Sequence, residues 1–401
     1  MVIKLPKDVS SIIERLNAAG YEAYAVGGCV RDSLLNRVPG DWDITTSALP
    51  QETKAIFQRT IDTGIEHGTV TVMMGRTGYE TTTYRIDGKY SDSRHPDSVS
   101  FTRSLEEDLK RRDFTINAMA YRDGELVDMF GGVSDLESHT IRCVGCAHER
   151  FKEDALRILR AVRFSAQLGF DIESETAQAA KELAPTLTGI SAERIHVELH
   201  KLLLSDHPDR LKVLHTLNID RVILPEMADK ADSGDFDSLL EKLGDSPQDT
   251  YVRWAMLLKF TGNERAIMNR LKFDNLTIHN VRELIRLSDA PILTLDRRGM
   301  RYLMNDAGAD NMLRLFAYRT AISPELDYRE AIALYEDIVS CEECTSLKEL
   351  KCNGRDLMEL GVPAGKTVGT ALDLLLERVL DDPALNTKEQ LLQICRKEYS
   401  L

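Results

Sequence analysis

Residues 27–43 read Gly-Gly-Cys-Val-Arg-Asp-Ser-Leu-Leu-Asn-Arg-Val-Pro-Gly-Asp-Trp-Asp, a glycine turn, a short helix and two aspartates one residue apart. Successive side chains of an extended strand point to opposite faces, so Asp41 and Asp43 are expected to share one face while Trp42 turns into the core. Two carboxylates on one face attract a hard cation such as Mg²⁺, which also leaves room for substrate phosphates. The stretch therefore predicts a metal site on a strand.

The glycine turn predicts an anion site beside that metal site. Gly27 and Gly28 let the backbone approach an anion closely, and a helix that starts near Val30 would direct unpaired N–H groups toward it. Two adjacent glycines are more often a plain strand-to-helix turn. Their combination with Arg31-Asp32 and the later Asp-x-Asp is far more restrictive, and it favours bound phosphate.

Composition and length limit the class of protein. A chain of 401 residues, 43% hydrophobic and 29% charged, suits a helix-rich globular protein of about two to four domains. We find no apolar run long enough for a bilayer, no signal peptide and no regular cysteine framework, so we expect a cytoplasmic protein with reduced thiols and no membrane association.

The charge distribution is compatible with a nucleic-acid partner on one face. The net charge of −14 argues against indiscriminate binding to polyanions. Residues 251–319, however, contain 12 Arg or Lys and 7 Asp or Glu. Such a basic segment suits RNA docked on one side, and a merely solvated helical surface explains it equally well.

The first 125 or so residues alternate helical and strand patterns. Residues 7–19 are amphipathic with helical spacing, residues 22–26 read as a strand, and residues 69–74 and 79–84 read as a hairpin around a glycine-containing turn. Glu80 lies in the second arm of that hairpin. It could complete a three-carboxylate site with the two aspartates, or it could be an edge charge facing water; we favour the site because the other two acids are present.

The remainder of the chain is predicted to be a loop followed by helices. Residues 85–100 are polar with almost no apolar periodicity, which indicates a long functional loop. After Phe151 the pattern becomes helical. The apolar positions that would pack the first of these helices inward are Leu156, Leu159, Val162 and Phe164.

A second cluster of charged residues covers residues 110–118. Arg111 or Arg112 could bind a triphosphate, because the guanidinium fork matches phosphate oxygens. Asp113 and Asn117 lie four apart, so in a helical turn they would share a face and could hydrogen-bond a ribose hydroxyl. The alternatives are a solvated basic face, an ordinary helix cap and a surface amide.

A third cluster, residues 153–163, carries an arginine at every third position of a predicted helix. Asp154 and Arg157 are neighbours at this spacing and offer an acceptor and several donors, which could match the Watson–Crick edge of a base. For an isolated pair, a structural salt bridge is the commoner explanation.

Together the three clusters resemble class II tRNA nucleotidyltransferases, or CCA-adding enzymes, and their relatives the bacterial poly(A) polymerases. The resemblance runs from about residue 24 to residue 206, where residues 190–198 are similar to the family's Glu-Arg helix-stabilising element, and it returns at residues 353–369. It implies an α+β protein with a small α/β nucleotidyltransferase head on a mixed or antiparallel sheet, followed by helical segments. The implied domains are a catalytic head (1–145), a neck for nucleobase recognition (146–207), a body (208–322) and a tail for tRNA binding (323–401).

The resemblance also implies a role for each clustered residue. Asp41 and Asp43 would bind catalytic Mg²⁺, with Glu80 as a third carboxylate. The phosphate-binding residues would be Gly27, Gly28, Arg31, Arg111 or Arg112, Arg160 and Arg163. The residues that contact the nucleoside would be Asp113 and Asn117 at the ribose and Asp154 and Arg157 at the base.

The implied reaction is template-independent addition of CCA to the 3′ end of tRNA from CTP and ATP, by two-metal-ion transfer with release of pyrophosphate. Residues 85–100 match the flexible loop that the family associates with the switch from C to A addition, which argues against a CC-only enzyme. An A-adding enzyme or a poly(A) polymerase shares the motifs, and a non-catalytic tRNA-binding protein on the same fold is the alternative of a different class. The sequence indicates no protein partner.

Two further patterns are rejected. Residues 361–367 have three residues between the glycines where a P-loop has four. Cys143, Cys146 and His148, with Cys341 and Cys344, have zinc-like local spacing, but the two groups lie far apart in the chain, so free thiols are favoured.

Overall fold

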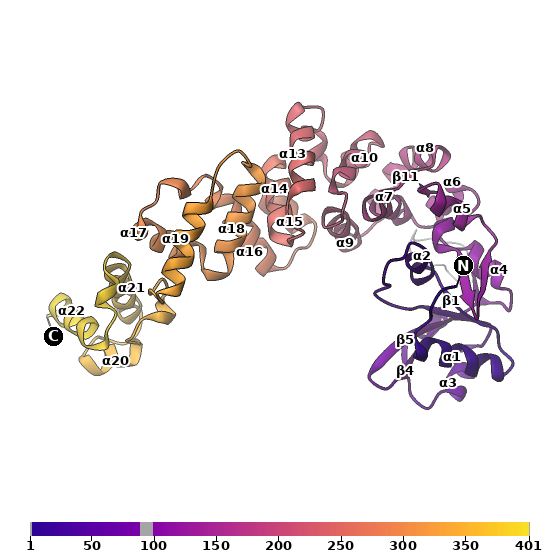
Figure 1. Ribbon diagram of the computed structural model, residues 1–401, viewed down its shortest axis with the longest axis horizontal. Coiled ribbons are helices and arrows are strands. Elements are labelled where there is room, and N and C mark those ends of the chain that lie inside the picture. Colours follow the sequence, from indigo (N-terminus) through magenta and orange to yellow (C-terminus); the bar gives the residue numbers. More distant parts are fainter. Residues whose placement is uncertain (1, 89–98, 401) are drawn as a thin grey trace. The chain divides into compact units, whose positions relative to one another are not determined.

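The computed structural model describes residues 2–88 and 99–400. The chain divides into two compact units, each described here by itself: unit 1 is Met1–Phe236 with Arg270–Lys272, and unit 2 is Asp237–Asn269 with Phe273–Leu401. All named strands belong to unit 1, and unit 2 is built from helices (Figure 1). Over the described residues, no helix is both long enough and apolar enough to span a bilayer.

A seven-stranded sheet forms the head of unit 1, in the order β3-β4-β5-β2-β1-β8-β9. The strands are β1 (Ala23–Val26), β2 (Ile44–Thr46), β3 (Thr60–Gly64), β4 (Thr69–Met74), β5 (Thr77–Thr83), β8 (Met119–Arg122) and β9 (Glu125–Asp128). β2 and β5 are parallel, and the other neighbours are antiparallel. The expected mixed sheet is therefore confirmed, and so is the antiparallel β4–β5 hairpin.

Short helices flank this sheet. They are α1 (Lys7–Ala18), α2 (Gly28–Leu34), α3 (Pro50–Ile56), α4 (Leu105–Lys110) and α5 (Gly132–Glu137), with the 3₁₀ turns η1 (Ile65–His67) and η2 (Thr115–Asn117). Helix α1 contacts β1 and buries the apolar face that its periodicity predicted, since Val9, Ile12, Ile13 and Leu16 are all 0% exposed. Helix α2 starts at Gly28, two residues earlier than expected.

The stretch predicted as one long loop is partly ordered into strands. β6 (Arg85–Asp87) pairs with β7 (Val99–Phe101) in antiparallel fashion, so both ends of the stretch are fixed by backbone hydrogen bonds. The prediction failed at these ends because three-residue strands carry too little apolar periodicity to be recognised. Residues 89–98, the middle of the proposed loop, lie outside the described residues.

The rest of unit 1 is mainly helical. Its elements are β10 (Thr140–Ile141), α6 (Ala147–Glu153), α7 (Leu156–Leu168), β11 (Asp171–Ile172), α8 (Ser174–Leu183), η3 (Ala184–Gly189), α9 (Ala192–Leu203), η4 (Pro208–Arg210), α10 (Leu211–Thr216), α11 (Asp220–Ile223) and α12 (Pro225–Ala228). Helix α7 packs on α9, and α6 packs on α8. The inward positions predicted for α7 are all buried. One addition to the predicted helical neck is β11, which pairs with β10.

Unit 2 contains a chain of packed helices. Its elements, with α13 and α15 crossing the boundary between the units, are α13 (Gly234–Asp245), α14 (Thr250–Thr261), α15 (Glu264–Arg270), α16 (Asn275–Arg286), η5 (Leu287–Asp289), η6 (Ile292–Thr294), α17 (Arg297–Ala307), α18 (Ala309–Ile322), α19 (Arg329–Ser340), η7 (Leu347–Glu349), α20 (Gly354–Leu360), α21 (Lys366–Asp381), η8 (Pro383–Leu385) and α22 (Lys388–Tyr399). Helix α14 contacts α16 and α18, and the last three helices share a core that includes Leu357, Leu375 and Leu391. The four predicted domains and the three boundaries between them stay predictions.

Candidate active site

The two aspartates lie in an extended segment that leads directly into β2. We expected them on the strand itself, but β2 begins at Ile44, although Val26 N–H still donates to the Asp43 carbonyl and extends the β1 pairing by one residue. Both aspartates are exposed, and Trp42 is only half-buried instead of lying in the core. The segment is not part of β2, because its backbone hydrogen bonding with β1 ends at Asp43.

Strand register brings Glu80 beside this segment. In the parallel β2–β5 pair, Ile44 is opposite Thr81, so Asp43 and Glu80 occupy the preceding positions on the two neighbouring chains. Residues directly opposite each other in a sheet point to the same face. The Glu80 carboxylate is close enough to raise the pKa of Asp43. Glu80 is itself exposed, and its place in a three-carboxylate site stays a prediction.

The electrostatics of the aspartates differ from those of an ordinary surface acid. Desolvation, followed by repulsion from Asp41, raises the pKa of Asp43 to about 6, against the opposing effect of Arg112. The Asp43 side chain is exposed to solvent, yet nearby protein atoms desolvate it. Both properties together indicate that Asp43 lies in a concave part of the surface. Among residues 2–88 and 99–400, neither aspartate side chain has a hydrogen bond or an ion pair.

The donor set fits a divalent cation. Two uncompensated carboxylates supply the hard oxygen ligands that Mg²⁺ or a similar ion prefers, and a cation would remove the repulsion between them. Within the described parts of the chain, no three His, Cys, Asp or Glu side chains are arranged closely enough to hold a metal by themselves. Such a site leaves ligand positions for substrate oxygens or water.

The glycine turn places an arginine next to the start of α2. Gly27 has a φ of +82°, a conformation that favours glycine, and it precedes the first helical residue, Gly28. A Cβ atom at Gly27 would lie 3.0 Å from Nη1 of Arg112, and one at Gly28 would lie 3.7 Å from Nη2 of Arg31. The missing side chains therefore allow two guanidinium groups to approach the turn closely.

The structure separates the roles of the two adjacent arginines. Arg111 donates from Nε and Nη2 to Oδ1 of Asp108, at 3.0 and 2.7 Å, whereas Arg112 reaches the same carboxylate only at 3.4 Å. Asp108 is 0% exposed; burial alone would raise its pKa, but Arg111 and then Arg112 hold the pKa below its ordinary value. The Nε atom of Arg112 is buried, and no described residue accepts from it. Arg112 is thus the better placed of the two for an added anion.

A hydrogen-bonded chain connects α2, η2 and α7. Arg31 donates to Oδ1 of Asn117 at 2.7 Å, Asn117 donates to Oδ1 of Asp113 at 3.1 Å, and Arg160 donates from Nε to Oδ2 of Asp113 at 2.9 Å. Burial would raise the pKa of Asp113, but Arg160 and Asn117 outweigh it and hold that pKa far below its ordinary value. Asp113 and Asn117 therefore share a face, as predicted.

One aromatic ring lies among three of the arginines. The guanidinium carbons of Arg31, Arg160 and Arg163 lie 5.0, 5.4 and 3.9 Å from the centroid of the Phe164 ring. Phe164 also meets Phe114 edge-on, with centroids 5.7 Å apart. Cation–π contacts help an apolar core hold several like charges close together. Sequence reasoning identified Phe164 only as a core residue, since its contact with Arg31 crosses more than 130 positions of the chain.

Arg163 has an internal partner. Its Nε donates to Oε2 of Glu198 on α9 at 2.5 Å and its Nη1 donates to Gln167, and the Arg163 and Glu198 side chains are 8% and 6% exposed. Oε1 of Glu198 also lies 3.9 Å from Arg160. Glu198 belongs to the stretch that resembles the Glu-Arg element, and that resemblance was the available signal for it. Direct contact of Arg163 with a triphosphate stays a prediction.

The predicted base-reading pair is arranged differently from a salt bridge on one helix. Asp154 lies in the break between α6 and α7, and Arg157 lies in the first turn of α7. Oδ2 of Asp154 accepts from Arg194 at 2.7 Å, while Arg157 donates to Glu153 at 2.6 Å. The simple salt-bridge alternative is therefore wrong, because each member of the pair has its own partner.

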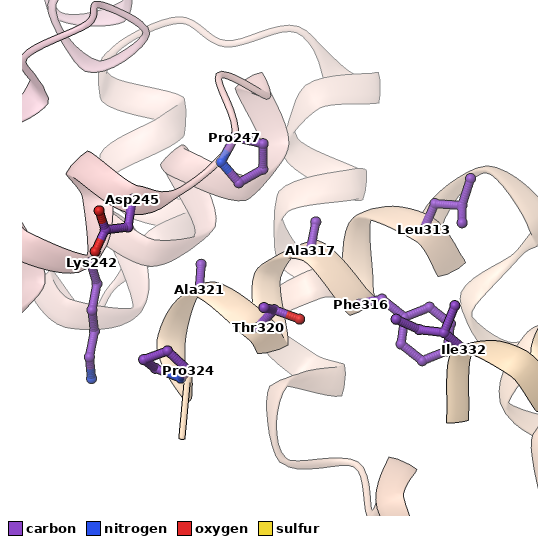
Figure 2. Close-up of a pocket in the computed structure, with 10 residues that line it drawn as sticks. All are labelled: Lys242, Asp245, Pro247, Leu313, Phe316, Ala317, Thr320, Ala321, Pro324 and Ile332. Carbon is purple, nitrogen blue, oxygen red and sulfur yellow. The ribbon is translucent and has the colours of Figure 1, made fainter. Parts of the chain in front are cut away.

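Two hollows away from the aspartate pair do not suit a nucleoside triphosphate. Figure 2 shows a hollow of about 440 Å³ in unit 2 whose walls are mostly apolar, including Leu313, Phe316 and Ile332, with Lys242 its one cationic lining residue. A second hollow of about 590 Å³, in unit 1, is lined by Cys143, Cys146 and residues at the start of α8. All seven cysteines are free. The clustered arginines and the aspartate pair remain the candidate site.

Comparisons with known proteins match three successive regions of the chain. The poly(A) polymerase head domain matches residues 23–142, the RNA- and SrmB-binding region of polymerase A matches residues 169–230, and domain 2 of tRNA nucleotidyltransferases matches residues 246–395. The CCA-adding enzyme of Lactiplantibacillus plantarum is 39% identical over 399 residues, covering 96% of this chain and 94% of that protein.

Solved structures share the fold. A crystal structure of the Bacillus stearothermophilus CCA-adding enzyme in complex with CTP superposes with a TM-score of 0.83 at 35% identity, covering 99% of this chain and 98% of the other. The Thermotoga maritima CCA-adding enzyme complexed with tRNA_CCA, at 23% identity and a TM-score of 0.65, covers 99% of this chain and 97% of its own, and shows the fold alone.

Proposed function

This chain belongs to the family of CCA-adding enzymes, and we propose that it adds C, C and A in turn to the 3′ end of tRNA, using CTP and ATP and releasing pyrophosphate. The observation that carries the proposal is the uncompensated aspartate pair next to the arginine-lined glycine turn. No template strand is needed, because protein side chains supply the hydrogen-bonding pattern that selects the base. The partners are tRNA and the two nucleotides.

We assign Asp41 and Asp43 to divalent metal ions, with Mg²⁺ the expected ion and Glu80 the expected third carboxylate. When bound, the metal would polarise the α-phosphate, activate the RNA 3′-hydroxyl and stabilise the departing pyrophosphate. The chain contributes by keeping both carboxylates free of arginine partners. Near pH 7 Asp43 is largely ionised in spite of its raised pKa, so it can serve as a ligand.

Positively charged residues around the glycine turn would hold the triphosphate. Arg112 is assigned the direct contact, because its buried Nε has no acceptor among the described residues, whereas Arg111 is engaged with Asp108. Arg31 and Arg160 flank the same region through the Asn117–Asp113 chain. Gly27, Gly28 and Arg163 complete the proposed set. These groups neutralise charge on the leaving pyrophosphate, which accounts for most of the protein's part in such a reaction.

The nucleoside would be recognised by two pairs. Asp113 and Asn117, already hydrogen-bonded to each other, are assigned to the ribose hydroxyls. Asp154 and Arg157 are assigned to the base: an ionised carboxylate accepts from the exocyclic amino group that cytosine and adenine share, and Arg157 donates to ring acceptors. At the same position of the base, uracil and guanine carry a carbonyl oxygen, which cannot donate a hydrogen bond to the carboxylate.

Unit 2 is proposed to bind the body of the tRNA, through the basic segment 251–319 and the C-terminal helices. The domain assignments 208–322 as body and 323–401 as tail belong to this proposal, as do the head (1–145) and the neck (146–207). A cytoplasmic location is proposed from the substrates, since tRNA maturation with CTP and ATP takes place where those molecules are made.

The deciding experiment offers purified protein three tRNAs, ending at the discriminator base, after C and after CC, each with CTP or ATP and Mg²⁺. We expect two C residues on the first tRNA, one on the second, and a single A on the third. Extension with A alone, or a long poly(A) product, would reassign the chain to the A-adding enzymes or the poly(A) polymerases. Binding of tRNA without any extension would identify a non-catalytic tRNA-binding protein.

A further inference from the structure

Asp154 is held at both carboxylate oxygens, by a nearby backbone N–H and by a side chain from another helix. Oδ1 accepts from the backbone N–H of Leu156 at 3.0 Å, which fixes the carboxylate to the start of α7. Oδ2 accepts from Nη2 of Arg194 at 2.7 Å, and Arg194 lies in the first turn of α9, 40 residues further along the chain. With both oxygens fixed, the carboxylate presents its remaining lone pairs in one direction.

Arg157 is held by a separate set of groups. It donates to Glu153 at 2.6 Å, to the carbonyl of Arg150 at 3.2 Å and to the carbonyl of Arg111 at 3.1 Å. The Asp154 carboxylate shares none of these partners, although the Asp154 backbone N–H donates to the same Arg150 carbonyl at 3.4 Å. The two side chains of the base-reading pair are therefore held by different groups: the Asp154 carboxylate by Leu156 and by Arg194 of α9, and the Arg157 guanidinium by α6 and the Arg111 backbone.

The Arg194 side chain is half-buried with only part of its hydrogen-bonding capacity used, which a purely structural role does not account for. Its Nη1 atom is buried, and no described residue accepts a hydrogen bond from it. Leaving a buried donor unsatisfied is unfavourable, and most buried polar side-chain atoms in proteins avoid it. The Arg194 and Asp154 side chains are only 21% and 15% exposed, so their contact is also shielded from competition by water. Among the described residues, Asp154 is the one hydrogen-bond acceptor found for the Arg194 side chain.

We propose that Arg194 is a specificity-determining positioning residue: by fixing Oδ2 of Asp154, it makes the enzyme select nucleotides whose base carries an amino group at C4 of a pyrimidine or C6 of a purine. The inference rests on the proposed function, in which Asp154 contacts the base. A fixed, ionised carboxylate can only accept, so it favours the amino groups of CTP and ATP and repels the carbonyl oxygens of UTP and GTP. A carboxylate released from Arg194 can rotate, and the repulsion weakens.

The test compares Arg194→Met with the wild type in single-nucleotide addition. kcat/KM is measured for CTP and UTP on tRNA ending at the discriminator and for ATP and GTP on tRNA ending in CC. We expect the preference for CTP over UTP, and for ATP over GTP, to fall about tenfold to a hundredfold. Arg194→Lys keeps the charge with a single donor group, and it should recover part of the preference.

A matched control separates orientation from folding. Arg210 makes an ion pair of the same length, 2.7 Å to Asp171, at 27% exposure and without contacting the base-reading pair. Arg210→Met should leave both nucleotide preferences unchanged. In a double-mutant cycle, Arg194→Met should reduce the preference no further once Asp154→Asn is present, because Arg194 acts through that carboxylate.

Several outcomes would overturn the role of Arg194. They are an unchanged preference in Arg194→Met, an equal loss of kcat/KM for all four nucleotides, and additive effects with Asp154→Asn. If Arg194→Met does not fold, Arg194→Lys decides: a lowered preference supports the role, and a wild-type preference overturns it. A wild-type protein that extends none of the tRNAs would instead overturn the proposed function itself, so the two failures are distinguishable.

Discussion

The acidic residues of unit 1 lie in two opposite electrostatic environments. In the segment before β2, Asp41 and Asp43 have no cationic partner among the described residues, and mutual repulsion helps to raise the pKa of Asp43. Around α7, the buried carboxylates of Asp113 and Glu198 are each bound by arginine. The difference separates an acid pair that awaits a ligand from acids that hold other side chains in place.

The two environments differ in how they would respond to an added cation. A cation would remove the repulsion between Asp41 and Asp43, whereas Asp113 and Glu198 already have arginine partners. Two unpaired carboxylates destabilise a fold, and such an arrangement is expected mainly at functional sites. Buried carboxylates paired with arginine contribute little net stability, yet removing one partner leaves an uncompensated charge. Substitutions in the two regions should therefore fail in different ways, one in activity and the other in folding.

The largest expected effect is the loss of catalysis in Asp41→Asn or Asp43→Asn. Each change removes a charged metal ligand, so addition of both C and A should fall by about a thousandfold or more. Single-turnover addition to tRNA measures it, and a melting temperature no lower than that of the wild type is the control. Retention of a tenth of wild-type activity in either variant would remove that aspartate from the metal site.

Glu198→Gln should mainly lower stability. It leaves the nearly buried Arg163 without its charged partner, which is expected to reduce the free energy of unfolding by about 3 kcal/mol. Urea denaturation measures the effect. Glu182→Gln, which alters an exposed pair with His148, is the matched control and should change stability by less than about 0.5 kcal/mol. Equal effects of the two substitutions would contradict the contrast between the regions.

Arg111→Met and Arg112→Met should differ although the residues are adjacent. Loss of Arg112 should raise KM for CTP about tenfold, since it removes a proposed triphosphate contact. Loss of Arg111 should act mainly on stability, because Asp108 is 0% exposed and, of its two arginine partners, would keep only Arg112 at 3.4 Å. Steady-state kinetics and thermal unfolding of both variants check the prediction. The reverse pattern would exchange the two assignments.

The smallest expected effect is a pH-dependent change in melting temperature. The pKa of Asp43 is about 6 in the folded protein and lower in the unfolded chain, so the charged form is penalised on folding above pH 6. Asp43→Asn should therefore raise the melting temperature of the metal-free protein at pH 7–8, and the gain should shrink as the pH falls below 6 and disappear below about pH 3, where the carboxylate is protonated in both states. A gain that does not depend on pH would show that charge is not its cause.

Local patterns in the sequence determined several features of this protein. Helical periodicity located α1 and the buried face of α7, and the glycine-containing turn located the β4–β5 hairpin. The motifs indicated the family and the three groups of candidate residues. These predictions succeed because hydrophobic spacing and turn chemistry act over a few residues, within the reach of a single element.

Only the tertiary structure decided which side chains meet. The choice between Arg111 and Arg112 depends on the position of Asp108, the partner of Arg163 is Glu198, and the partner of Asp154 is Arg194 rather than the neighbouring Arg157. Long charged side chains can reach several partners at similar energy in water. Packing α7 against α9 excludes that water and fixes the partners of Arg163 and Asp154, a result that no local pattern contains.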